Sequence, residues 1–576
     1  MSRRVLCLLL ALCLLCSGCG KQQSAPAAGS ALGTEPALPS ETPQPDSSLE
    51  GQSPVPPGNG TFAMPYNASY GWNPYACRGM ENRAVMQLIY EGLFTMNPDF
   101  EAEFCLCEEF SVSEDGLLYE LTLRDATFSN GKKLQALDVI HSMGLAEASE
   151  LYSGRFADIA SYYINGEHII VELSTANDRL PCLLTFPIVP SGSSTEAPPG
   201  TGPFVRGSDS VLTPNGQWWK GTGTLSFQTV ALYSSASAED TRDNFEIDNV
   251  HFVYNNPSAS SAATFHCDYE LWNSPGTTMQ YIGFNFIEGI FQDTSVRKAL
   301  THAIDRSSIV EQAYHNFADS AVLPVAPATS MYFEELVQDY NFTSSQSAMK
   351  ELTDTASFWL PEERIAALKN PEAEVSPSPE VTEAPEDEEE PLGEEEPLEE
   401  EPEFPTDGEN GDGEDEDGKE KEPGYNRIVF IVRAGNLARV TAAQQVAEDL
   451  ARVGFTVDLQ ELEDDEYYTA LNAGAFDIYY GETVMKPDFD LRELLLPEGN
   501  LSYGGIGEES KLRSLLYNAM ENVGNRYDLY KYIMEQGLLC PVLFVNNAVF
   551  TTRGVFTDLS PAPDNLFYQI ENIKVN

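Results

Sequence analysis

Apolar positions near the middle of the chain follow first the spacing of a strand and then that of a helix. Residues 281–286, YIGFNF, are apolar and aromatic enough for a strand. Asp293 or Thr294 can then cap a helix whose apolar residues recur at helical spacing. These apolar residues are Val296, Ala299, Leu300, Ala303 and Ile304. Ser308 and Glu311 have the spacing of a capping box, which predicts a second helix. The pattern indicates a strand followed by two packed helices in an α/β protein.

Further elements are predicted on both sides of this segment. Asp115-Gly116 is a hairpin turn signal before an alternating strand. Later in the chain, a strand, a helix stopped by Gly454 and another strand form a β–α–β unit. The predicted strands are residues 117–124, 168–173, 225–230, 428–432, 455–459, 476–480 and 541–551, and the later helices are residues 441–453 and 527–536.

Two stretches lack the apolar residues of a core. Residues 19–60 are mostly Pro, Ser, Gly, Ala and Glu, which is typical of a disordered tether. Residues 366–424 form an acidic insertion, and 25 acidic but only two basic residues lie between Pro371 and Gly424. We expect this insertion to be disordered and interpret it as a solvated surface loop. The alternative is weak capture of cations or of a cationic partner.

The N-terminus has the pattern of an export signal. Arg3 and Arg4 precede an apolar run over residues 5–16 that is too short to remain as a membrane span. Cys16-Ser17-Gly18-Cys19 resembles a bacterial lipobox, with Cys16 where Leu is usual. This resemblance implies removal of residues 1–18 and lipidation of Cys19; the alternative is an ordinary signal peptide. Six other cysteines remain in the mature chain, and an even number permits disulfides outside the cytoplasm without fixing their pairing. They are Cys77, Cys105, Cys107, Cys182, Cys267 and Cys540.

Charge and motifs argue against several classes of function. The chain has 33 basic and 90 acidic residues, a net charge of −57, which disfavours nucleic acid or an anionic membrane surface as partner. None of its six histidines lies in an HExxH motif or accompanies a GxSxG serine, and no phosphate-binding loop is present. His266-Cys267-Asp268 is a poor metal site, because adjacent residues of a strand point to opposite faces. We therefore predict no enzyme activity, no cofactor and no metal.

Several motifs occur in the order of one known family. They are Asn73-Pro74, LIYEGL at residues 88–93, SEDG at 113–116, GTGPF at 200–204, and the segment YIGFNF with VRKAL and AIDR over 281–306. Together they resemble the extracellular solute-binding proteins of family 5, the peptide- and nickel-binding group of ABC importers. The resemblance implies a two-lobed α/β fold of the periplasmic-binding-protein type (type II, cluster C-like), with mixed sheets and a hinge between the lobes.

The resemblance also implies how the chain is divided. Lobe I is expected at residues 61–280, and the strand after it crosses into lobe II. Lobe II is expected at 281–365 and 425–545, with the acidic insertion between, and residues 546–576 return to lobe I. Two lobes joined by more than one crossing can close on a ligand between them.

Candidate binding residues come from loops of both lobes, because a binding site needs aromatic walls and a few fixed polar groups. They are Asn73, Tyr75 and Trp272 from lobe I, and Glu482, Asp488, Asp490 and Tyr503 from lobe II. Peptide binders of the family have an ADYPDP-like loop whose first Asp pairs with the ligand's ammonium group. Aligning Pro487-Asp488 with that loop places Met485 at this Asp. Either Glu482 supplies the charge, or the ligand has no free amino end.

For each candidate the alternative is ordinary loop packing or capping. Asp488 and Asp490, for example, can cap the helix that contains Leu491, Leu494 and Leu495.

These observations predict a solute-binding lipoprotein of an ABC importer that captures peptides and delivers them to permease subunits. We expect a monomer, held by the lipid on Cys19 at the outer face of the bacterial cytoplasmic membrane. An alternative with the same fold is a receptor for nickel, a metal chelate or another non-peptide solute. Alternatives of another class are an extracellular hydrolase and a surface adhesion lipoprotein.

Overall fold

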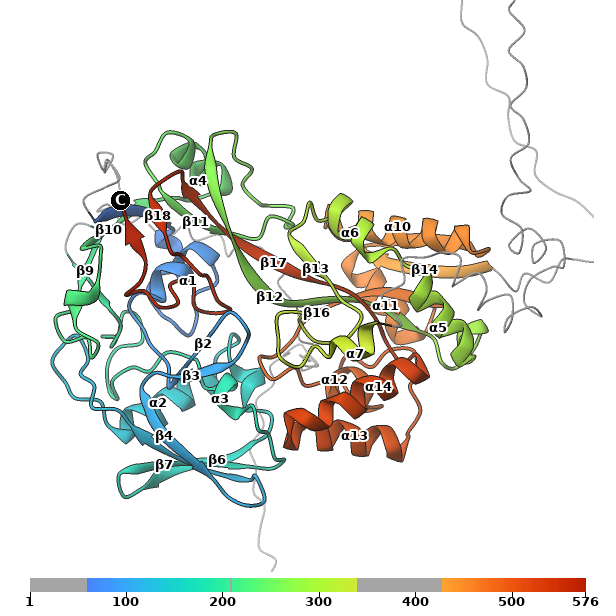
Figure 1. The fold of residues 1–576 in the computed structure, drawn as a ribbon, viewed down its shortest axis with the longest axis horizontal. Helices are drawn as coiled ribbons and strands as arrows, with labels where there is room; N and C mark the ends of the chain where they lie inside the picture. Colours follow the sequence, from blue (N-terminus) through green and yellow to red (C-terminus); the bar gives the residue numbers. More distant parts are fainter. Residues whose placement is uncertain (1–59, 208–209, 339–426) are drawn as a thin grey trace, which may run out of the picture. The chain divides into compact units, whose positions relative to one another are not determined.

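The computed structural model describes residues 60–207, 210–338 and 427–576 (Figure 1). The predicted signal peptide, the lipidation residue Cys19, the tether up to residue 59 and the acidic insertion lie outside these ranges.

The first lobe is built from two sheets whose strands follow β1-β10-β9-β8 and β4-β5-β7-β6. The strands of the first sheet are β1 (Thr61–Tyr66), β8 (Phe204–Arg206), β9 (Val211–Pro214) and β10 (Thr229–Ser234). Those of the second are β4 (Cys107–Val112), β5 (Leu118–Leu123), β6 (Ile159–Asn165) and β7 (His168–Leu173). A short pair, β2 (Phe94–Met96) and β3 (Ala102–Phe104), lies beside them, together with the helices α1 (Met80–Met86), α2 (Ala136–Glu147), α3 (Leu180–Leu183) and α4 (Ala238–Glu246).

A larger mixed sheet organises the rest of the described chain, in the order β11-β17-β12-β16-β14-β15. Its strands are β11 (Phe252–Asn255), β12 (Tyr269–Phe284), β13 (Ala318–Ser320, beside β17), β14 (Arg427–Arg433), β15 (Thr456–Leu462), β16 (Ile478–Val484) and β17 (Cys540–Thr552). Strand β14 is parallel to β15 and β16, whereas β12 is antiparallel to β16 and β17. The long strands β12 and β17 lie side by side between the first lobe and the second (Figure 1).

Alternate residues of this sheet pack into two different cores, as the strand period requires. Tyr281, Ile431 and Tyr479 belong to one core, while their neighbours Ile282 and Phe430 belong to the other. Helices α7 (Glu334–Val337), α11 (Asp464–Ala473), α12 (Arg492–Leu495), α13 (Ser510–Glu521) and α14 (Arg526–Gln536) contribute to the first of these cores. Helices α5 (Thr294–Ala303), α6 (Arg306–Gln312) and α10 (Leu437–Arg452) contribute to the second. The elements of these two cores form the second lobe, and Met96, Phe100 and Cys182 of the first lobe also pack into the first of the two cores.

The first lobe has a separate core, to which the C-terminal residues Phe556, Phe567 and Ile573 also contribute. Phe556 lies in β18 (Phe556–Thr557), which pairs with β19 (Lys574–Val575), and Phe567 and Ile573 lie between these two strands. The fold is therefore the predicted two-lobed α/β fold with mixed sheets. The predicted domain boundaries themselves stay a prediction.

Most predicted elements are confirmed, and two are corrected. Asp293 caps α5, accepting from the backbone N–H of Ser295 at 2.8 Å. The capping box from Ser308 is wrong: α6 begins two residues earlier, because Asp305 accepts from the Ser308 N–H at 3.0 Å. The strand predicted at residues 225–230 is also wrong. Strand β10 begins only at Thr229, and the apolar side chain of Phe227 instead stacks on Phe204, with ring centroids 5.1 Å apart.

The six cysteines predicted to remain in the mature chain all lie in the described ranges, and all six are free thiols there. Five are buried, and Cys267 is partly exposed. Burial raises the pKa of the Cys77, Cys107 and Cys182 thiols to about 11. The buried thiols therefore act as small apolar groups of the core rather than as covalent links.

Candidate ligand-binding site

Strand β16 is paired along its whole length on one side and along only half of it on the other. Strand β12 pairs with every residue of Ile478–Val484, but β14 pairs only with Ile478, Tyr479 and Tyr480. Among the described strands, residues 481–484 therefore have a partner on the β12 side alone. We call them the open edge. Such an edge offers backbone N–H and C=O groups to another extended chain.

Glu482, in the open edge, is surrounded by donors. Its carboxylate accepts from Gln280 Nε2 at 2.7 Å, from Arg439 Nη1 at 3.1 Å and from Arg433 Nη2 at 3.4 Å. Gln280 lies directly opposite on β12, and its Oε1 accepts from Tyr480 Oη at 2.9 Å. Because the amide of Gln280 is nearly fully buried and bonded at both ends, the carboxylate is held in one position.

The two arginines beside Glu482 differ in how many close hydrogen bonds their guanidinium groups make within the chain. Arg439, in the first turn of α10, also donates to the Arg433 and Ala434 carbonyl oxygens at 3.1 and 2.8 Å, and its side chain is only 4% exposed. Arg433, at the carboxyl end of β14, makes longer contacts: 3.3 Å to Tyr468 Oη and 3.7 Å to Asp464. Its side chain is 15% exposed. Arg433 therefore has the capacity to bind a further anionic group, and Arg439 does not.

Tyr503 lies near this cluster. Its ring meets the ring of Tyr479 edge-on, with centroids 6.0 Å apart. Burial raises the pKa of Tyr503, and the nearby Tyr468, which contacts Arg433, adds to this rise. Tyr503 thus lies among aromatic residues, one of which, Tyr468, contacts Arg433.

The three candidates from the first lobe lie elsewhere. Asn73 Oδ1 accepts from the backbone N–H of Tyr75, and Tyr75 Oη donates to the Pro187 carbonyl at 2.6 Å. Burial raises the pKa of Tyr75 well above its usual range. Trp272 Nε1 donates to Thr551 Oγ1 at 2.9 Å.

Trp272 and Gln280 lie opposite Val549 and Leu543 of β17, six positions apart, so at strand spacing Trp272 lies roughly 20 Å from Gln280 and its partner Glu482. The structure therefore does not bring Trp272 and Glu482 together. The contacts of Asn73 and Tyr75 fit the packing and capping alternative.

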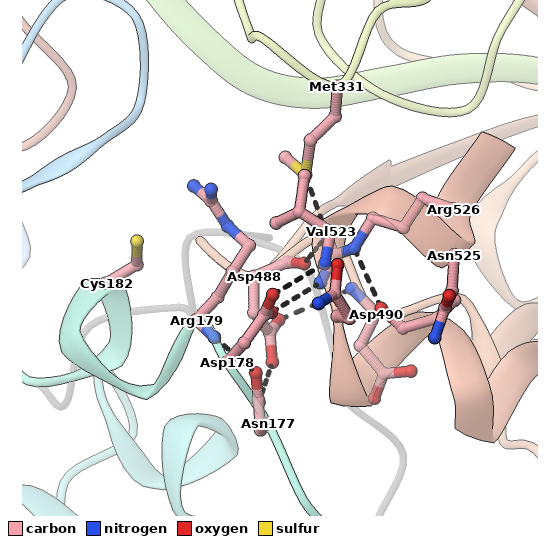
Figure 2. A network of polar contacts seen from close by, with 12 residues as sticks. Asn177, Asp178, Arg179, Cys182, Met331, Asp488, Asp490, Val523, Asn525 and Arg526 are labelled. Atoms are coloured by element: carbon pink, nitrogen blue, oxygen red, sulfur yellow. Dashed lines mark hydrogen bonds and ion pairs between the residues drawn. The ribbon is translucent and has the colours of Figure 1, made fainter. Parts of the chain in front are cut away.

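Asp488 faces the first lobe, and Asp490 lies in the same loop (Figure 2). Asp488 Oδ2 accepts from Asn177 Nδ2 at 2.9 Å. Asp490 accepts from Arg492 Nε at 2.9 Å and from Lys486 Nζ at 3.1 Å. It also accepts from the N–H of Arg492, the first residue of α12, which supports the capping alternative for Asp490. Both carboxylates are therefore already bonded within the chain.

The electrostatics of Asp490 follow from these contacts. Burial raises the pKa of Asp490, but the hydrogen bonds from Arg492 and the charges of Lys486 and Arg492 outweigh burial and lower the pKa to about 2. Arg492 also pairs with Asp158 of the first lobe, with its Nη1 3.1 Å from Asp158 Oδ1. The loop that follows β16 is thus built as a contact between the lobes. Met485, at its start, is buried in a core of the second lobe.

Within the described ranges, no three His, Cys, Asp or Glu side chains are grouped as they would be to hold a metal ion. None of the helices in those ranges combines the length and the apolar run needed to cross a bilayer.

Four residues that matter here were not among the sequence-based candidates: Arg433, Arg439, Gln280 and Asn177. Arg433 could have been found, since ligand groups often follow the carboxyl ends of parallel strands, and Arg433 ends the predicted strand 428–432. The other three carry no such signal. Their importance depends on partners at least 43 residues away in the sequence.

Comparison with known proteins agrees with this architecture. Residues 101–370 match the bacterial extracellular solute-binding proteins, family 5 middle region. The glutathione-binding protein GsiB of Salmonella paratyphi A is 24% identical over 302 residues, which are 48% of this chain and 58% of GsiB. The chain thus spans little more than half the length of such relatives.

Two solved structures share the fold. The ABC transporter substrate-binding protein CtaP of Listeria monocytogenes is 14% identical, with a TM-score of 0.63 over 90% of this chain and 100% of CtaP. The oligopeptide-binding protein AppA of Bacillus subtilis, in complex with a nonapeptide, is 17% identical, with a TM-score of 0.53 over 91% of this chain and 100% of AppA. Residues 101–370, just under half of this chain, are thus similar to the middle region of the bacterial extracellular solute-binding proteins of family 5, and the two-lobed α/β fold is the one that these solved structures share.

Proposed function

We propose that this protein binds peptides between its two lobes and delivers them to the permease of an ABC importer. The observation that carries the proposal is the open edge at residues 481–484. Beside it lies Arg433, whose guanidinium group makes only long contacts within the chain. An extended peptide pairs its backbone with such an edge and so binds with little regard to its side chains. The nonapeptide bound by AppA, which shares the fold, supports a peptide as the class of ligand.

Arg433 gives the bound peptide its direction. A guanidinium group binds a carboxylate through charge-assisted hydrogen bonds, and Arg433 is the arginine at the edge whose present contacts are long. The ligand's terminal carboxylate therefore lies beside Arg433.

The amino end of the peptide has no equivalent partner in the loop after β16. Met485 is apolar and buried, and Asp488 and Asp490 are bonded to Asn177 and Arg492. An ammonium group at Glu482 would have to share that carboxylate with Arg433 and Arg439. Recognition of a free amino end therefore contributes little to affinity.

The cellular setting follows from the N-terminal pattern. The apolar run and Cys19 support a location outside the cytoplasm, with the protein held to the outer face of the membrane by a lipid on Cys19. The protein acts as a monomer that binds its ligand and releases it chemically unchanged. Its partners are the permease subunits that receive the ligand.

The test is to identify what the protein carries. The full chain is purified from cells, denatured, and the released small molecules are identified by mass spectrometry. Heterogeneous short peptides are the expected result. A single metal chelate, or a non-peptide solute, would overturn the proposal, and so would cleavage of a panel of peptides by the purified protein.

A second measurement tests the mode of binding. Calorimetric titration compares a peptide with the same peptide carrying N-methyl groups on alternate backbone nitrogens. Pairing with the open edge predicts a loss of affinity on N-methylation, because each methyl group removes one backbone donor. Unchanged affinity would exclude backbone pairing.

A further inference from the structure

Residues 177–179 of the first lobe bond directly to two parts of the second lobe (Figure 2). Asn177 Nδ2 donates to Asp488 Oδ2 at 2.9 Å. The Asp178 N–H donates to the Met520 carbonyl at 2.9 Å, and the Val523 N–H donates to Asp178 Oδ2 at 2.6 Å. Backbone and side-chain bonds therefore join the same short segment to the loop after β16 and to the end of α13.

Each side of this contact is held by its own lobe. In the first lobe, Tyr119 Oη donates to the Asn177 carbonyl at 2.8 Å, and Asn177 Oδ1 accepts from the Arg179 N–H at 3.0 Å. In the second lobe, Arg526 donates from Nη1 to the Asp488 carbonyl at 2.8 Å and from Nε to the Ala519 carbonyl at 3.0 Å. Because each half is positioned before the halves meet, joining them orders few additional groups.

Contacts around these bonds extend the joined surface. Arg492 of the second lobe pairs with Asp158 of the first, and the rings of Phe100 and Phe489 meet edge-on with centroids 5.5 Å apart. Asn177 and Asp488 are each only 1% exposed, so their bond is shielded from water. A shielded polar contact is strong when it is made and unfavourable when only one partner remains buried.

We propose that residues 177–179 are a latch that holds the two lobes together without a ligand and must release before a ligand can enter or leave. Every bond of the latch joins two groups of the chain itself, so no ligand atom is needed to close it. The latch can open again, because some of its buried polar groups lack hydrogen-bond partners. Among the described residues, Arg179 Nε is buried there with no hydrogen-bond partner, and Arg526 Nη2 makes no hydrogen bond but lies 3.7 Å from Asp178 Oδ1 as a long ion pair. The inference concerns the chain without ligand and does not depend on whether the solute is a peptide.

Hydrogen exchange measures the latch directly. The Asp178 and Val523 amides bond across the two lobes, so they are protected only while the lobes are in contact. The full chain is freed of ligand in guanidinium and refolded, and exchange is followed by mass spectrometry in peptides that cover these amides. We expect slow exchange at both positions without any ligand. If the Asp178 and Val523 amides exchange as fast as those of an unprotected loop, the proposed latch is overturned.

Asn177→Asp tests the key bond. The change keeps the acceptor for Arg179 but replaces the donor to Asp488 with a second carboxylate, so repulsion opens the lobes. Exchange at Val523 should then rise on the order of tenfold or more, while residues 428–432 in β14 stay protected. Asn165→Asp makes the same change at an exposed position of the first lobe and should leave exchange at Val523 unchanged. Equal rates in the two variants would overturn the proposal.

A second variant keeps the test decisive if Asn177→Asp does not fold. Asp158→Asn removes the charge that pairs with Arg492 and should raise exchange at Val523 in the same direction, by a smaller factor. No rise in a folded Asp158→Asn variant would show that the lobes are not held by these contacts. Absence of co-purified peptides would overturn the proposed function and leave the latch intact.

Discussion

Gln280 and Glu482 lie opposite each other on β12 and β16, and the Gln280 amide donates to the Glu482 carboxylate at 2.7 Å. Together with the guanidinium groups of Arg433 and Arg439, this bond fixes a charged cluster at the point where β14 stops covering β16. The cluster joins strands from three separate parts of the sequence, and it stands beside the edge at which we expect the ligand to pair.

Glu482→Gln should destabilise the protein by roughly 2 kcal/mol. The substitution keeps the shape of the side chain but removes the anion that balances Arg439, whose side chain is only 4% exposed. Guanidinium unfolding of the variant and the wild type measures the difference. Glu461→Gln, at an exposed position of β15, is the matched control and should change stability little. Equal midpoints for Glu482→Gln and the wild type would contradict the expectation.

Arg433→Gln should weaken the binding of peptides with a free terminal carboxylate by about tenfold, or ~1.4 kcal/mol. The same peptides with an amidated end should bind both proteins alike, because they offer Arg433 no charge. Titration calorimetry with matched acid and amide peptides measures this. Arg427→Gln, at the exposed opposite end of β14, serves as control. Equal losses for acid and amide would show that Arg433 acts through the fold and not through the ligand.

Gly283→Ala and Gly481→Ala should each cost about 1–3 kcal/mol of stability. The two glycines lie in adjacent strands, and each is covered by a tyrosine ring from across the ladder. A Cβ atom at Gly283 would lie 2.1 Å from Tyr479 Cζ, and one at Gly481 would lie 2.4 Å from Tyr281 Cζ. Thermal unfolding measures the loss. Gly216→Ala, where a Cβ meets nothing within 4 Å, should be nearly neutral. A stable Gly283→Ala variant would mean that the ring of Tyr479 moves aside freely.

The free energy of unfolding should fall by about 2 kcal/mol between pH 4 and pH 2 through Asp490 alone. Its pKa is lowered from the ordinary value of 3.8 to about 2, so its contribution is complete above pH 4 and is lost as the pH falls toward 2. Urea unfolding at a series of pH values measures this slope. Asp490→Asn should remove this part of the pH dependence, and an unchanged slope would assign it to other carboxyl groups.

Local patterns predicted most of the elements, because helix and strand periods record which positions are buried. The strand before Asp293, the cap of α5 and the β–α–β unit after residue 427 all followed from neighbouring residues. The wrong predictions also concern local interactions. Asp305 rather than Ser308 caps α6, since several acceptors compete for the same N–H groups and only the folded chain selects one.

The sequence by itself determined the α/β class, the order of the elements and the family motifs. Only the tertiary structure decided which polar groups meet. Asn177 and Asp488 are 311 residues apart in the sequence, and Gln280 and Glu482 are 202 residues apart. Their pairing depends on strand register and on the approach of two lobes, which residue spacing does not encode. Residue spacing also could not predict the partners of Asp488 and Asp490. The loop pattern indicated that they bind a ligand, but in the folded chain they bond to other residues of the protein.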